Sequence, residues 1–273
     1  MNTVKSLKDG LFTVCLLLII ASTVASSFDG LLFKPTVAGI FEPRVGASYL
    51  VQTEKLRLDI GHSADLTDFI IDDGAEIRIG ADFFTYTRLR SENNFKFPVE
   101  TSDYFFGVNS SCKLGTDFGD LSLRLRASHI SSHLVDGFAK DSVFRQLPFV
   151  YSREFVDLLV AFEINQFRLY AGSNYIFSTK PKNFEPFNPQ IGFDIITEVF
   201  SPVYFLAGYD FRLVGIDKVY TGVNSAQAGF LFNTGQNAGV FIGAFYYSGK
   251  SMHGMFYNEY DSYAGLGFQV YFK

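Results

Sequence analysis

The chain of 273 residues carries 23 lysines and arginines against 28 aspartates and glutamates, which gives a formal net charge of -5. This mildly acidic balance excludes a nucleic-acid-binding protein built on a basic face, so we expect no nucleic-acid partner. Charged residues make up 19% of the chain and hydrophobic residues 48%, which excludes long disordered tracts. With 32 phenylalanines, 15 tyrosines and 24 glycines, the composition favours strands and tight turns and predicts an all-β protein.

The first residues have the layout of a secretory signal peptide. Lys5 and Lys8 precede an apolar run, Leu11 to Ile20, and small residues follow as far as Ala25. The apolar run is about half as long as the roughly 20 residues that a membrane-spanning helix needs. We therefore expect residues 1–25 to be removed on export, with an uncleaved anchor as the weaker alternative.

Cleavage near Ala25 would leave Cys112 as the one cysteine of the mature chain. A single thiol cannot form an internal disulfide, so packing must hold the exported protein together. No second apolar stretch approaches about 18 residues, which excludes a membrane protein built from a bundle of helices.

An alternation of apolar and polar residues runs through the rest of the chain. Between Ala75 and Arg90 the odd positions are apolar or threonine, whereas the even positions carry all the charges. Residues 121–128 divide in the same way, and only a strand places alternate residues on opposite faces. Weaker alternation recurs over lengths close to the roughly 9 to 11 residues of a transmembrane strand, in residues 104–112, 167–177, 203–213, 223–232, 240–246 and 260–272.

This pattern predicts a transmembrane antiparallel up-and-down β-barrel in the outer membrane of a Gram-negative-type bacterium. A soluble sandwich or lipocalin-like barrel also alternates, but its exterior must be mostly polar. The end of the chain, FQVYFK at residues 268–273, resembles the aromatic closing strand that the barrel-assembly machinery reads. We therefore expect two partners, outer-membrane lipid and, through Phe268 to Phe272, that machinery. The sequence sets no oligomeric state.

Parity limits the number of strands, because single-chain bacterial barrels have an even number and both chain ends in the periplasm. Ten strands fit between Ala75 and Phe272, with short periplasmic connections alternating with longer outer ones. Residues 44–60 would add a hairpin that turns near residues 53–55, which makes twelve strands, and ten remain possible if that hairpin pairs outside the barrel. We expect residues 26–43 to form an N-terminal periplasmic segment and residues 44–273 to form the barrel.

Two sequence blocks resemble a known family of bacterial barrels. Residues 33–49 contain the order F-x-P followed by EPR, and residues 126–136 read RASHISSHLVD. Both blocks resemble an outer-membrane β-barrel family known only as a domain of unknown function, the second through its histidine, serine, serine, histidine, leucine, aspartate motif. The resemblance implies the fold and the location, and it assigns no activity.

The second block carries the candidate site. Continuing the strand phase beyond Ala127 places His129, Ser131 and His133 on the lipid-facing side at the outer rim. A serine hydroxyl becomes a good nucleophile when an imidazole takes its proton, and the imidazole works best when a carboxylate fixes its tautomer. We therefore predict His129 as the base, Ser131 as the nucleophile and Asp136, folding back from the loop, as the orienting acid.

The pair is also similar to that of the lipid A deacylases, outer-membrane barrels whose histidine and serine lie two residues apart on one strand. The similarity implies a serine-dependent lipid acyl hydrolase, with Ser132 where that family has asparagine. Three readings stay open: a structural role in which His133 and Asp136 pin the loop, the hydrolase, and a metal site of His129, His133 and Asp136. The sequence indicates no cofactor.

The remaining polar residues predict less. Inward arginines such as Arg78 and Arg124 would form interior salt bridges or line a narrow diffusion pore, which is a further functional alternative. His62 and His253 lie in expected connections, and we expect neither to be catalytic.

Overall fold

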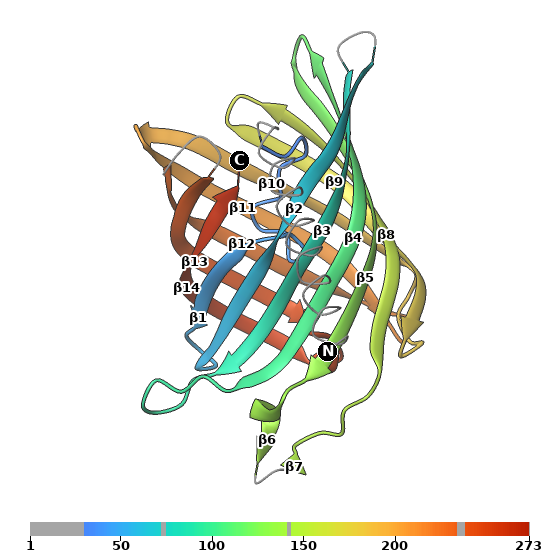
Figure 1. Ribbon diagram of the computed structural model, residues 1–273, viewed down its shortest axis with the longest axis vertical. Coiled ribbons are helices and arrows are strands. Elements are labelled where there is room, and N and C mark those ends of the chain that lie inside the picture. The colour runs from blue at the N-terminus through green and yellow to red at the C-terminus, as the bar shows by residue number, and fades with distance from the viewer. Residues whose placement is uncertain (1–29, 72–74, 141–142, 234–237, 273) are drawn as a thin grey trace, which may run out of the picture.

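The computed structural model describes residues 30–71, 75–140, 143–233 and 238–272, so the expected signal peptide lies outside the described residues. Twelve antiparallel strands form a closed barrel, in which the first strand pairs with both the second and the last (Figure 1). This confirms the expected architecture and the preferred number of strands. Within the described residues, no helix is long and apolar enough to cross a membrane.

Each barrel strand pairs with the barrel strands that precede and follow it in the sequence. A small hairpin lies outside the wall. That hairpin, β6 (Ala139–Lys140) with β7 (Val143–Phe144), interrupts the connection between β5 and β8. Two short 3-10 helices, η1 (Asp136–Phe138) and η2 (Gly254–Phe256), follow β5 and β13. The barrel strands are β1 (Val45–Leu50), β2 (Lys55–Ile71), β3 (Ala75–Arg90), β4 (Val99–Thr116), β5 (Gly119–Leu134), β8 (Tyr151–Ile164), β9 (Phe167–Lys180), β10 (Phe187–Phe200), β11 (Val203–Ile216), β12 (Val219–Asn233), β13 (Ala238–Lys250) and β14 (Tyr260–Phe272).

The connections differ between the two ends of the barrel. At the end where β14 finishes, β8 joins β9 through residues 165–166, and β10 joins β11 through residues 201–202. The longer connections β3–β4, β5–β8 and β13–β14 lie at the opposite end, at the bottom of Figure 1. We call this the outer end, following the expected orientation. The β1–β2 turn at residues 51–54 falls where the sequence predicted it.

β2 is longer than the sequence predicted. We expected a connection after Ile60, but the strand continues to Ile71 in register with β3. His62 is therefore in a strand and not in a connection. The added part of β2 also bonds to the chain inside the lumen: the Asp65 carboxylate accepts a hydrogen bond of 2.9 Å from the backbone N–H of Leu32.

Apolar side chains face outwards and charged ones face the lumen, as the alternation predicted. Val108 is 61% exposed and Leu125 is 45% exposed, whereas Arg124 and Arg126, on either side of Leu125, are 5% and 2% exposed. Such a wall suits hydrocarbon on its outside, where a charged side chain would cost roughly 2 to 4 kcal/mol at the membrane midplane. A soluble barrel has the opposite arrangement, with its apolar side chains inside.

Ion pairs fill much of the lumen. Arg126 Nε lies 3.4 Å from Asp82 Oδ2, and Arg212 Nε donates to Asp210 Oδ1 at 3.0 Å. Buried charges are tolerated in a protein interior when each has a partner. The expected interior salt-bridge network is thus present.

The chain before β1 lies inside this network. We expected residues 26–43 to form a periplasmic segment and the barrel to begin at residue 44. The described residues before β1, 30–44, instead run inside the lumen that the strands enclose, and we call them the luminal segment (Figure 1). Its backbone is bonded to inward side chains, since Val37 N–H donates to Asp194 at 3.0 Å and Arg168 donates to the Lys34 carbonyl oxygen at 2.9 Å. Its apolar residues, such as Ala38 at 0% exposure, are buried.

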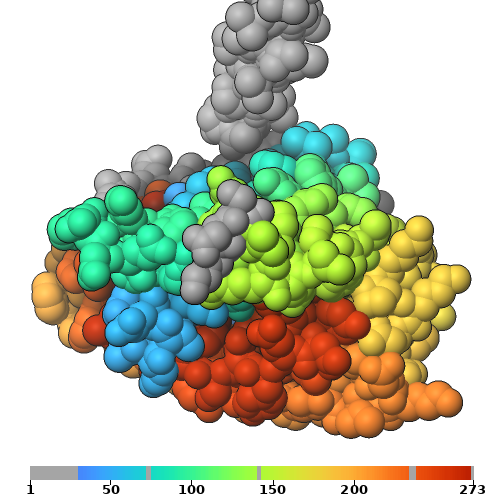
Figure 2. All heavy atoms as spheres, turned by 90° about the horizontal axis from the view of Figure 1, so that it is seen from below, coloured from blue at the N-terminus to red at the C-terminus, as the bar shows by residue number. Residues whose placement is uncertain are grey.

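The β13–β14 connection, residues 251–259, also folds into the barrel, at the outer end. His253 Nδ1 lies 2.7 Å from Asp103 Oδ2 on β4, and the N–H of Gly254 donates to the other oxygen of the same carboxylate at 2.7 Å. Met255 and Phe256 are buried beside them. Figure 2, which looks onto this end, shows red atoms of the β13–β14 region beside the blue segment and directly below the yellow-green one. The luminal segment and this loop together occupy the lumen.

Candidate functional site

The predicted histidine and serine lie on the outward face of β5, close to its outer end. The ladder places Phe106 of β4 and Glu154 of β8 directly beside His129. In the next row towards the outer end, Tyr104 and Ser152 flank Ser131 in the same way. Hydroxyl, imidazole and carboxylate groups from two adjacent strands therefore meet on a surface that is otherwise apolar.

A carboxylate binds the imidazole. His129 Nδ1 lies 2.9 Å from Glu154 Oε1, and the side chains are 40% and 30% exposed. Ser152 Oγ donates to the same oxygen at 2.6 Å, and Ser178 of β9 also bonds this carboxylate. Because an ionised carboxylate only accepts hydrogen bonds, it fixes the tautomer with the proton on Nδ1. Nε2 of His129 is then left as an acceptor.

Ser131 follows His129 by two residues, so both side chains leave the same face of β5. Within the described part of the chain the Ser131 hydroxyl makes no hydrogen bond. Bonds between a nucleophile and its base are often long before substrate binds and shorten in the reacting complex. The arrangement supplies a base with a fixed tautomer beside an unengaged hydroxyl.

The other residues of the predicted motif separate from this pair. Asp136 is exposed in η1, beyond the end of β5, and the structure does not bring it to His129. His133 faces outwards, where its ring meets the edge of Tyr104 at 5.9 Å between centroids. Ser132 faces the lumen and is 2% exposed, and its hydroxyl accepts a hydrogen bond of 3.1 Å from the N–H of Met255.

The proposed metal ligands do not assemble. Among the residues that the structure describes, no group of three or more His, Cys, Asp or Glu side chains could hold a metal ion. The predicted set of His129, His133 and Asp136 is separated because strand β5 ends at Leu134, before Asp136, which lies outside the ladder.

Glu154 is the site residue that the sequence reasoning missed. Outward positions of β8 at Val156, Leu158 and Val160 are apolar, and Glu154 interrupts this row with a charge. A carboxylate on a lipid-facing row was therefore a signal within the sequence. No signal in the sequence identified His129 as the partner of Glu154, because a long connection separates β5 from β8.

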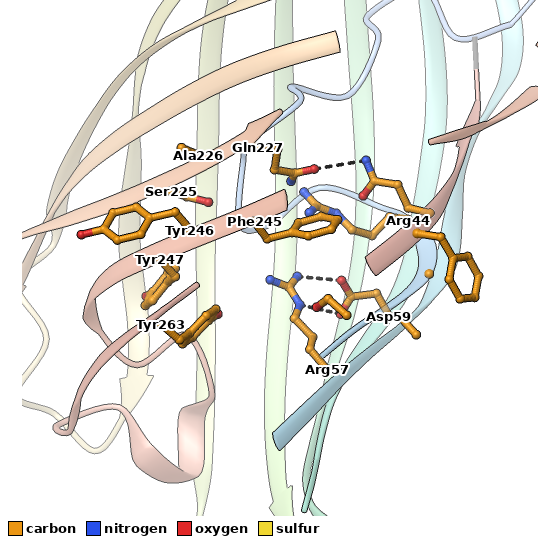
Figure 3. Close-up of a pocket in the computed structure, with 15 residues that line it drawn as sticks. Arg44, Arg57, Asp59, Ser225, Ala226, Gln227, Phe245, Tyr246, Tyr247 and Tyr263 are labelled. Atoms are coloured by element: carbon orange, nitrogen blue, oxygen red, sulfur yellow. Dashed lines mark hydrogen bonds and ion pairs between the residues drawn. The ribbon is translucent and has the colours of Figure 1, made fainter. Parts of the chain in front are cut away.

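A separate hollow lies inside the lumen, between the luminal segment and the wall formed by β1, β2 and β12–β14. Figure 3 shows Arg44 and Arg57 extending into it, with Arg57 bonded to Asp59 at 2.8 Å. Gln269, which also lines the hollow, donates through Nε2 to Gln227 Oε1 at 3.2 Å. Arginine, aspartate and tyrosine are the titratable groups that line it, so it provides neither an imidazole base nor a thiol for hydrolysis.

Comparison with known proteins places the chain in a family. Residues 59–272 match the model of a family described as "Protein of unknown function (DUF1207)". A search of curated proteins found no match.

Solved structures with a similar fold are outer-membrane barrels. Outer membrane phospholipase A from Escherichia coli aligns with a TM-score of 0.52 at 11% identity over 92% of this chain and 98% of that one. An active-site mutant of that enzyme aligns with a TM-score of 0.53 at 11% identity, over the same shares of the two chains. The translocator domain of the autotransporter NalP from Neisseria meningitidis covers 97% of both chains at 10% identity, with a TM-score of 0.37. At 11% identity, the similarity to the phospholipase structures establishes the barrel fold alone.

Proposed function

This chain belongs to the DUF1207 family of proteins of unknown function, and we propose from its outer rim that it is an outer-membrane lipid acyl hydrolase. Ser131 is the nucleophile, His129 the general base and Glu154 the residue that orients the base. One observation carries the proposal: His129 Nδ1 lies 2.9 Å from Glu154 Oε1, on the lipid-facing side and two residues from Ser131. Glu154 takes the orienting role that the sequence analysis predicted for Asp136.

The chemistry follows from the free Nε2 of His129. Nε2 accepts the proton of the Ser131 hydroxyl as Oγ attacks the carbonyl carbon of an ester-linked acyl chain. The tetrahedral intermediate collapses when the alkoxide of the lipid leaves with that proton, which gives an acyl-serine. A water molecule that loses a proton to Nε2 then attacks the acyl carbon, Ser131 regains its proton, and the fatty acid leaves.

The position of the site favours a lipid substrate. His129 and Ser131 lie on the face that carries Val108, Leu125 and Leu158, which are between 40% and 61% exposed. Acyl chains would lie along these side chains, while the polar rim would meet the ester at the membrane interface. The phospholipase A with the same fold makes a phospholipid the first substrate to test, and lipopolysaccharide is the second.

The test is release of fatty acid by the full chain reconstituted into phospholipid vesicles, measured by mass spectrometry of the extracted lipids. Ser131→Ala and His129→Ala should each reduce release to the level of empty vesicles while the circular dichroism spectrum stays that of a folded barrel. Ser173→Ala is the matched control, because Ser173 is an outward serine of β9 away from the site. It should keep the activity of the wild type.

A structural role for the same bonds predicts a different result. If the bond between His129 and Glu154 only joins β5 to β8, the wild type releases no more fatty acid than empty vesicles. Release that is unchanged in Ser131→Ala would also end the hydrolase proposal, since it would leave the serine without a catalytic role.

A further inference from the structure

The connection between β5 and β8 has one face fixed to the barrel. Within residues 143–150, which we call the outer strap, Gln146 Nε2 donates to the carbonyl oxygen of Met255 at 2.8 Å. The Phe149 ring meets Tyr257 edge to face, with 6.1 Å between centroids. Met255 and Tyr257 belong to the loop that closes the lumen, so these contacts hold the strap against the outer end of the barrel.

The outer strap also carries exposed apolar side chains. Val143, Leu147 and Val150 are 68%, 84% and 69% exposed. The strap has one charged residue, Arg145, whose guanidinium carbon lies 5.9 Å from the centroid of the Phe138 ring. Because transfer of apolar surface out of water is favourable, such a row marks a surface that is covered by a protein or a membrane.

The strap continues the lipid-facing surface of the wall. Val150 directly precedes β8, and the inward Tyr151 separates it from the outward Ser152, so Val150 shares a face with Ser152 and Glu154. The candidate site therefore lies between two apolar zones. Leu158 and its neighbours lie on one side of it, towards the middle of the wall, and the strap lies on the other, towards the outer end.

We propose that the outer strap sits in the membrane interface and contacts lipid, so that a bilayer lipid reaches Ser131 without crossing water. The occupant of the exposed row is the surrounding lipid, at the level where its acyl chains begin below the headgroups, because the row is continuous with the lipid-facing wall. The ligand of the site is then a packed lipid with ester-linked chains rather than a dispersed soluble ester. This last step rests on the proposed function, whereas contact of the strap with lipid does not.

Contact with lipid can be measured because the chain contains no tryptophan. A single tryptophan is introduced as Leu147→Trp, and its fluorescence is measured in vesicles with and without brominated phospholipid, which quenches on contact. Ile242→Trp on the lipid-facing wall and Thr53→Trp in the β1–β2 turn are the two controls. We expect quenching in Leu147→Trp to match that in Ile242→Trp. Quenching no stronger than in Thr53→Trp would overturn the proposal.

A second measurement separates the strap from the chemistry. Leu147→Asp should reduce hydrolysis of packed vesicles about 10-fold and leave hydrolysis of a soluble short-chain ester unchanged, because a carboxylate disfavours insertion into lipid. An equal loss on both substrates would contradict a role in lipid delivery. If the wild type hydrolyses neither substrate, the proposed function fails, and the quenching experiment still decides whether the strap contacts lipid.

Discussion

Glu42 and Arg124 form a two-bond ion pair between the luminal segment and the strand that carries the candidate site. Arg124 Nη2 donates to Glu42 Oε1 at 2.6 Å, and Arg124 Nη1 donates to Oε2 at 2.9 Å. Arg126 Nη2 adds a third bond to Oε2 at 3.2 Å. One carboxylate therefore compensates two buried guanidinium groups on the inward face of β5, while His129 and Ser131 occupy its outward face.

Glu42→Gln should destabilise the barrel strongly. Without the charge of Glu42, the ion pairs that Arg124 and Arg126 keep among the described residues are the longer contacts with Asp157 at 3.9 Å and Asp82 at 3.4 Å. Removing one partner of a buried ion pair costs about 3 to 5 kcal/mol in the free energy of unfolding. Glu92→Gln is the matched control, because the Glu92 side chain is 42% exposed in its pair with Arg90. Surface pairs contribute roughly 0 to 1 kcal/mol. Denaturant unfolding in detergent micelles measures both, and equal effects of the two substitutions would contradict the prediction.

The contribution of Glu42 should depend on pH. Burial alone would raise the pKa of Glu42, but the charges of Arg124 and Arg126 outweigh it, and the pKa lies well below the ordinary value. A carboxyl with a lowered pKa stabilises the fold fully above the pKa of the unfolded chain, about 4.3, and progressively less as the pH falls towards the lower, folded value. The difference in stability between wild type and Glu42→Gln should thus be full at pH 7 and shrink below about pH 4. A difference that stays constant down to about pH 2 would argue against this linkage.

Two histidines, His129 and His133, flank Ser131. Substitution of Glu154, which binds His129, and of His133 itself should identify the base. Glu154→Gln retains the shape of the side chain but removes the charge that fixes the tautomer of His129, so we expect hydrolysis to fall by about two to four orders of magnitude. His133→Ala should keep the activity of the wild type, because the His133 ring contacts Tyr104. Among the described residues, His129 and His253 are each paired with a carboxylate, whereas His133 is not. Initial rates of fatty acid release measure both. The reverse ranking would assign the base to His133.

Ser131 and Ser132 are adjacent in sequence and should respond in opposite ways to the same substitution. Ser132→Ala leaves the buried N–H of Met255 without its acceptor, which should lower the free energy of unfolding by about 1 to 3 kcal/mol and spare hydrolysis. Ser131→Ala should abolish hydrolysis with no loss of stability. Unfolding curves and rates of fatty acid release for the two variants give the comparison, and a shared loss of stability would place both serines in a structural role.

The sequence predicted the parts of the structure that depend on local periodicity. Alternation along each strand was enough to assign the outward face to His129, Ser131 and His133, because period two is a property of a single strand. The preferred number of twelve strands also needed the rule that such barrels have an even number. The register between strands is not local. The pairing that sets Glu154 against His129 is fixed by β5 and β8 across a long connection, so the sequence alone favoured Asp136, which is nearer in the chain.

The luminal segment shows a second limit. Residues 30–44 have no period that would distinguish a periplasmic arm from a chain inside the barrel, and their position depends on acceptors and donors of distant strands. Asp194 of β10 and Arg168 of β9 bond the backbone of Val37 and Lys34. An inward row of arginines predicted salt bridges, but it left open whether their partners lay on the wall or on a separate segment.

The filled lumen predicts that the wild type does not conduct. The luminal segment contacts residues such as Asp194, whereas the β13–β14 loop is fixed to Asp103 nearer the outer end, so each obstructs a different part of the lumen. Planar-bilayer recordings of the wild type should therefore show no discrete steps. Deletion of residues 30–43 alone, or replacement of residues 251–257 by a short turn alone, should also stay silent, while the combined variant should conduct. Steps in the wild type would instead support the narrow diffusion pore, and they would show that the two segments leave the lumen in a membrane.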